Sequence, residues 1–165
     1  MTLSCRGKDT KKIEKLATQR PSVTDFAYLY PIKSEKIMYS ELKTIIEAAW
    51  ENRELLKDNA TQEAIRTVVE LVDKGSLRTA EPLDLEKSLW QVNEWVKKAI
   101  ILYFPIQPMR KMEAGELEWY DKMELKHGYE ELGVRVVPHA IARYGAYIAP
   151  GAILMPSYVN IGAYV

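Results

Sequence analysis

The last 25 residues repeat with a period of six, and this feature most limits the folds open to the chain. Counted in sixes from Ile141, they read IARYGA, YIAPGA, ILMPSY and VNIGAY, followed by Val165. Each block opens with an apolar or aromatic residue, and small residues take the fifth place: Gly145, Gly151, Ser157 and Ala163. Such hexapeptides are typical of a parallel β-helix, in which every six residues form a short strand and a turn. A hairpin pattern has period two and does not explain this interval. We therefore expect the opening side chain of each block to point into a narrow core.

A helical domain is predicted ahead of these repeats, over residues 38–105. The first helix should begin at Ser40, a good N-cap residue, and run to about Lys57. Its apolar residues recur at intervals of three and four, which is the spacing of one helix face: Leu42, Ile45, Ile46, Ala49 and Trp50. A second helix should be capped by Asn59 or Thr61 and end at Gly75, whose lack of a side chain suits the left-handed position past a helix.

The third helix is predicted from Val92 to Tyr103, because Pro105 resists its continuation. Residues 75–82 are expected to connect it to the second helix. Trp50, Trp90 and Trp95 are expected in the core of this domain. Residues 106–134 lose the helical period and predict a packed linker with one or two short strands, which leaves 135–165 as the start of the β-helix. The predicted fold class is α+β.

The first 37 residues differ from the rest in charge. They carry eight basic and four acidic residues, whereas the remainder carries 15 basic and 19 acidic residues. They show no long apolar period, and Pro21 and Pro31 interrupt them. A basic docking arm is one interpretation. We favour a disordered or unrelated extension, with Met38 as the natural start.

Composition excludes several classes of function. The whole chain of 165 residues has 23 basic and 23 acidic residues, so no net field would recruit nucleic acid or an anionic membrane. Cys5 is the only cysteine, which forbids an intrachain disulfide. We find no apolar run near the ~20 residues that span a bilayer, and no secretory signal. A cytoplasmic protein is expected.

Four further segments bear a family resemblance, in the order in which they occur along the chain: DKGSLRTAE (73–81), WVKKAI (95–100), YDKM (120–123) and GVRVVP (133–138). With MPSYVNIGAYV (155–165), they make residues 39–165 similar to the tetrahydrodipicolinate N-succinyltransferases, a branch of the hexapeptide acyltransferases. The resemblance implies a left-handed β-helix and a homotrimer. It also implies transfer of succinyl from succinyl-CoA to the amine of ring-opened tetrahydrodipicolinate, which gives N-succinyl-2-amino-6-oxopimelate on the route through diaminopimelate to lysine. No metal and no bound cofactor are expected, since succinyl-CoA is a co-substrate.

Arg135 is the one site residue that the resemblance places in this chain, as a substrate-binding arginine in GVRVVP. A guanidinium can bind a carboxylate of the dicarboxylate acceptor through two parallel hydrogen bonds. The resemblance puts the catalytic acid and most of the CoA groove downstream of Val165. We therefore expect the chain to be C-terminally truncated, and residues 1–165 alone to be inactive in succinyl transfer.

Other residues are weaker candidates for a site. His139 is expected to be structural or solvent-facing, and His127 with His139 gives too few histidines for a zinc site. Lys97 and Lys98 are expected on a solvated face. Two alternatives stay open: a different hexapeptide acyl-CoA transferase, or a non-catalytic helical interaction module.

Overall fold

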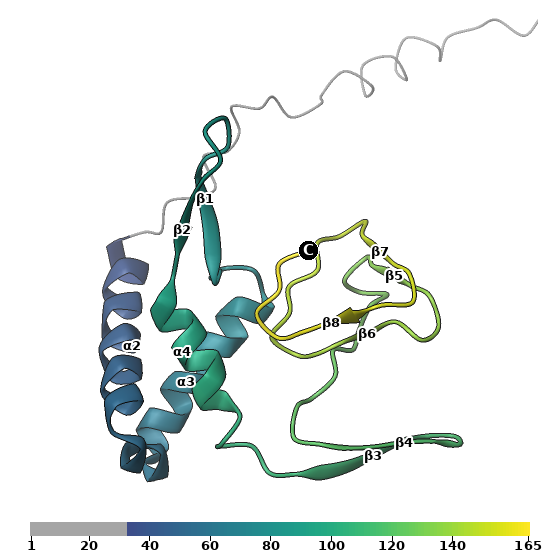
Figure 1. The fold of residues 1–165 in the computed structure, drawn as a ribbon, viewed down its shortest axis with the longest axis horizontal. Helices are drawn as coiled ribbons and strands as arrows, with labels where there is room; N and C mark the ends of the chain where they lie inside the picture. The colour runs from purple at the N-terminus through teal and green to yellow at the C-terminus, as the bar shows by residue number, and fades with distance from the viewer. Residues whose placement is uncertain (1–32) are drawn as a thin grey trace, which may run out of the picture. The chain divides into compact units, whose positions relative to one another are not determined.

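The computed structural model describes residues 33–165, so the predicted extension lies almost entirely outside the described residues. Contacts divide the chain into two compact units, Met1–Lys36 and Ile37–Val165, and the second holds the whole described core. This unit mixes helices with short strands (Figure 1). None of the described helices is long and apolar enough to cross a membrane.

Three α-helices pack together as the helical part of the unit: α2 (Lys33–Glu51), α3 (Asn59–Asp73) and α4 (Glu94–Tyr103). Figure 1 shows them gathered into one bundle, with the 3₁₀ turn η2 (Arg53–Lys57) between α2 and α3. Leu42, Ile46 and Ala49 of the predicted first helix face are buried in the shared core, whereas Ile45 is 37% exposed. The largest fully buried side chains of this core are Ile46, Ile65, Leu102, Met123, Val68, Val69, Val72 and Val96, and all but Met123 lie on the helices.

The predicted starts of the first two helices are wrong. α2 begins seven residues before Ser40, whose hydroxyl donates to the carbonyl of Ile37 from inside the helix. It also stops at Glu51, because Asn52 is extended and accepts from the N–H of Glu54, which starts η2 instead. The cap of α3 is Asp58, whose carboxylate accepts from the N–H of Thr61.

The end of α3 and the position of α4 are confirmed. Gly75 has φ +75°, the left-handed conformation expected just past a helix. α4 covers all but the first two residues of the predicted third helix. Trp50 and Trp95 pack against the core, but Trp90 does not: its side chain is 57% exposed, so its predicted burial is wrong.

Two antiparallel hairpins interrupt the helical pattern. Strands β1 (Ala80–Asp84) and β2 (Leu89–Val92) form the first, so part of the predicted connection is a strand, and Trp90 lies on β2. Strands β3 (Arg110–Ala114) and β4 (Leu117–Asp121) form the second, within the predicted linker. Both extend away from the bundle in Figure 1.

Residues 134–165, here called the repeat segment, form short parallel strands that pair with one another. β5 (Arg135–Val136) pairs with β7 (Ile153–Leu154), and β6 (Ile141–Ala142) pairs with β8 (Tyr158–Val159). A parallel bridge joins Tyr147 to Tyr164. The chain therefore comes back beside itself after 17 or 18 residues, about three blocks of six.

The side chains that point inward are not the predicted ones in the first three blocks. Ala142, Ile148 and Leu154, with Val134 ahead of the first block, form the buried cluster of the repeat segment, whereas Ile153 is 57% exposed. Each of the first three blocks thus places its second residue in this cluster. Val159 follows Leu154 by only five positions. It pairs with Ala142 and packs against the same cluster. Because this interval is one position shorter than six, the inward side chain of the fourth block is its first residue, Val159. A prediction that counts in fixed sixes cannot show this change.

Candidate functional site

Arg135 lies at the start of β5, where the first pass of the repeat segment meets the second. Its N–H donates to the carbonyl of Ala152 at 3.0 Å, and Ile153 is its partner in register. The side chain is exposed. Across residues 33–165 its guanidinium has no hydrogen bond or ion pair, so its fork of donors is open to a ligand.

Arg143 shows how a structural arginine looks in the same segment. Its guanidinium lies 2.7 Å from a carboxylate oxygen of Asp121 and 3.2 Å from the side-chain oxygen of Asn160. Those contacts join β4 to the repeat segment and use the donors that Arg135 leaves free. Among the described residues, Arg135 makes no such side-chain contact.

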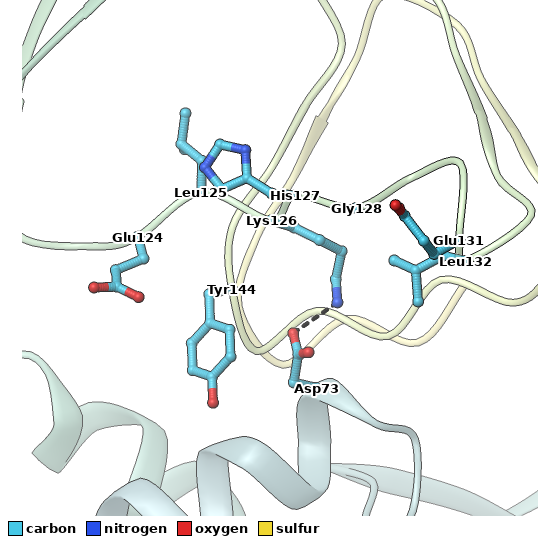
Figure 2. Close-up of a pocket in the computed structure, with 9 residues that line it drawn as sticks. All are labelled: Asp73, Glu124, Leu125, Lys126, His127, Gly128, Glu131, Leu132 and Tyr144. Carbon is cyan, nitrogen blue, oxygen red and sulfur yellow. Dashed lines mark hydrogen bonds and ion pairs between the residues drawn. The ribbon is translucent and has the colours of Figure 1, made fainter.

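An open hollow of about 560 Å³ lies where α3 meets the repeat segment. Figure 2 shows its lining, with Lys126 and Asp73 pointing toward one another: Asp73, Glu124, Leu125, Lys126, His127, Gly128, Glu131, Leu132 and Tyr144. Arg135 is not among the lining residues. The hollow and the predicted substrate residue are therefore separate features.

The charged groups at the base of the hollow are already paired. Asp73 Oδ1 accepts from Lys126 Nζ and from the N–H of Gly145, each at 2.7 Å. The phenol of Tyr144 donates to the Glu70 carboxylate, to which Lys74 also binds at 2.6 Å. These contacts tie the last turn of α3 to the repeat segment, and they use the side chains of Asp73, Lys126 and Tyr144.

Tyr144 and Glu70 of this network have shifted pKa values. Burial, helped by the neighbouring Glu70 carboxylate, raises the pKa of Tyr144 well above its ordinary value. The pKa of Glu70 is lowered, first by its hydrogen bond with Lys74 and then by that with Tyr144. Each shift favours the protonation state in which Tyr144 donates and Glu70 accepts, so the network is a structural joint. The sequence analysis missed it, although Asp73 stands in one of the resembling segments.

His127 and His139 belong to no group of potential metal ligands among the described residues. Within residues 33–165, no group of three or more His, Cys, Asp or Glu side chains could hold an ion. His139 is exposed and has φ +77°, six residues before Gly145 at φ +85°. His139 therefore occupies a left-handed turn position, and Gly145 occupies the next such position in the repeat segment.

The expectation for the lysine pair holds for Lys97 only. Lys97 lies 3.4 Å from Glu94 on an exposed surface. Lys98 instead pairs with Glu47 and lies 5.6 Å from the ring centre of Trp50, so it links α4 to α2.

Comparison with known proteins decides the relationship. Residues 41–106 match the family model described as tetrahydrodipicolinate N-succinyltransferase N-terminal. A protein of Variovorax paradoxus is 45% identical over 136 residues, which are 76% of this chain and 48% of the relative. A protein of Acinetobacter baylyi is 46% identical over 136 residues, again 76% of this chain and 49% of the relative. Both carry the name 2,3,4,5-tetrahydropyridine-2,6-dicarboxylate N-succinyltransferase.

The chain is similar to tetrahydrodipicolinate N-succinyltransferases over about three quarters of its length. The family model falls on the helices and the first hairpin, from within α2 to just past α4. A third relative with the same name, from Cereibacter sphaeroides, is 44% identical over 77% of this chain. The chain spans about half the length of these curated succinyltransferases.

Proposed function

We propose that this chain is the front part of an N-succinyltransferase that moves the succinyl group of succinyl-CoA to the amine of ring-opened tetrahydrodipicolinate. The observation that carries the proposal is the 44–46% identity to relatives of that name over about three quarters of the chain. The product would be N-succinyl-2-amino-6-oxopimelate, on the route through diaminopimelate to lysine. Succinyl-CoA enters as a co-substrate, and the protein would work in the cytoplasm.

The proposed architecture is a left-handed parallel β-helix that begins at residue 135, behind a helical domain at 38–105 and a linker at 106–134. Parallel pairing at intervals of 17 or 18 residues supports this assignment, since three sides of six residues make one turn of such a helix. The proposed working form is a homotrimer.

Arg135 is proposed as the residue that binds a carboxylate of the acceptor. Its exposure and its lack of an internal partner among the described residues support this role. The reaction itself needs a deprotonated amine and stabilisation of the oxyanion that develops on the thioester carbonyl. No residue of this chain is proposed as the catalytic acid or base, which is expected after Val165.

The test uses a chimera in which residues 38–165 replace the matching half of the Acinetobacter baylyi relative. Arg135→Ala should raise the KM for the acceptor by about tenfold or more, because a charged hydrogen-bond pair is worth ~1.5–3 kcal/mol. The KM for succinyl-CoA should stay nearly unchanged. Arg53→Ala, at the end of the helical bundle, is the matched control. An unchanged acceptor KM in the Arg135 variant would remove this residue from the site.

A further inference from the structure

Arg78, like Arg53 and Arg135, makes no side-chain hydrogen bond or ion pair within residues 33–165, but unlike them it is half-buried. It follows α3 and precedes β1. Its guanidinium carbon lies 3.4 Å from the ring centre of Tyr164, whose ring centre in turn lies 4.5 Å from that of Tyr147. Stacking of this kind fixes the plane of a guanidinium but occupies only its face.

The edges of this guanidinium carry its N–H donors, and nothing in the described part of the chain accepts from them. Arg66 and Arg110 of the same fold behave differently. Arg66 lies 3.0 Å from a carboxylate oxygen of Glu63, and Arg110 lies 3.4 Å from one of Glu124. A half-buried cation without an anion loses hydration that no internal partner replaces. This imbalance indicates an external anion.

The backbone around Arg78 is held in place from three sides. Its carbonyl accepts from the side-chain amide of Asn93 at 2.9 Å. The hydroxyl of Thr79 donates to the carbonyl of Gly162 at 3.2 Å. Gly75 lies so close to Tyr147 that a Cβ there would stand 2.6 Å from the ring. The guanidinium is therefore oriented before any ligand arrives, which lowers the entropy lost on binding.

We propose that Arg78 is an anion-binding residue that receives a carboxylate of a small dicarboxylic acid, with the ring of Tyr164 as its support. The site rests on the contacts of Arg78. The choice of a carboxylate rests on the proposed function, because both the acceptor and the succinyl group carry one. A planar fork with two parallel donors fits a carboxylate. Arg78 would thus add a second carboxylate-binding residue to Arg135.

The test follows the Nε–Hε resonance of Arg78 by nitrogen-15 NMR while succinate is added to the 165-residue protein. A saturable shift is expected, with sodium chloride at matched ionic strength as the control. Arg78→Met should weaken succinate binding by about tenfold or more, as the loss of a charged hydrogen-bond pair implies. Arg78→Lys keeps the charge and the fold but loses the planar fork, so it should bind weakly too. Arg135→Met should leave the Arg78 shift in place.

The proposal is overturned if succinate gives no saturable shift at Arg78, or if chloride gives the same shift. It is equally overturned if Arg78→Lys binds succinate as well as the unchanged protein, because the role would then be charge alone. Its failure can be told from failure of the proposed function. If succinate binds at Arg78 but the protein transfers no succinyl group, the anion site stands and the proposed function fails. If succinyl is transferred but succinate does not bind at Arg78, the proposed function stands and the anion site fails.

Discussion

Lys126 and Asp73 form an ion pair of 2.7 Å between the chain that precedes the repeat segment and the end of α3, and their side chains are only 6% and 16% exposed. Asp73 also accepts from the N–H of Gly145, so one carboxylate joins three segments of chain. Because both side chains are almost fully buried, removing either partner leaves the other charge without a counter-charge and strongly destabilises the fold.

We expect Asp73→Ala to lower the free energy of unfolding by about 3–5 kcal/mol, because it leaves the Lys126 ammonium buried without an anion. Urea denaturation followed by tryptophan fluorescence measures the change. Glu54→Ala is the matched control: its pair with Lys57 is exposed, and such pairs contribute at most about 1 kcal/mol. Equal effects of the two substitutions would show that the buried pair does not hold the junction.

Gly75→Ala should destabilise the protein more than Gly115→Ala. Both glycines have positive φ, +75° and +61°, so each substitution carries the strain of a left-handed alanine, about 1–2 kcal/mol. Only at Gly75 would the new Cβ meet a neighbour, the ring of Tyr147, whereas open space surrounds Gly115. The difference between the two melting temperatures isolates the contact, and no difference would mean that the ring moves away freely.

Leu154→Ala and Ile153→Ala test which residues of the repeat segment face inward. Leu154 is 6% exposed and should cost about 2–5 kcal/mol when truncated, while Ile153 is 57% exposed and should change stability little. The two substitutions are adjacent in sequence and differ only in the face of the strand. If Ile153→Ala proved the more damaging, the fixed frame of six would be right after all.

Stability should fall above pH ~10 through Tyr144. Its raised pKa means that the folded protein holds the phenolic proton more tightly than the unfolded chain does. The contribution is therefore complete below the ordinary tyrosine pKa near 10 and is lost as the pH rises beyond it. Urea unfolding on both sides of pH ~10 should show a steeper decline for the unchanged protein than for Tyr144→Phe. Parallel declines would contradict the assignment, since Tyr103, Tyr129 and Tyr147, whose pKa values are also raised, remain in both proteins.

The helices could be predicted from sequence because their signals are local. Leu42, Ile46 and Ala49 repeat at the spacing of one helix face, and all three are buried. The ends were harder, because Asp58 caps α3 from a position that competes with Asn59 and Thr61. The first hairpin escaped prediction because Leu83, Trp90 and Val92 are apolar yet exposed, so their pattern does not separate a buried face from a solvent face.

The residues of the candidate site also differ in whether the sequence could predict them. Arg135 was predicted from the short motif that surrounds it, and its role stays a prediction. The pair of Lys126 with Asp73 joins residues 53 positions apart, and the stacking of Arg78 on Tyr164 joins residues still more distant. Neither residue type nor local spacing predicts such contacts, because the path of the chain between them decides which side chains meet.

The most direct measurement of the central claim is acceptor-dependent release of free thiol from succinyl-CoA by the chimera of residues 38–165 with the second half of the Acinetobacter baylyi relative. The account predicts thiol release that requires the amine acceptor, because this front half would supply the substrate arginine to a complete enzyme. A folded chimera that releases no thiol, while the unaltered relative does so in the same assay, would contradict the claim that residues 38–165 are the front part of a succinyltransferase.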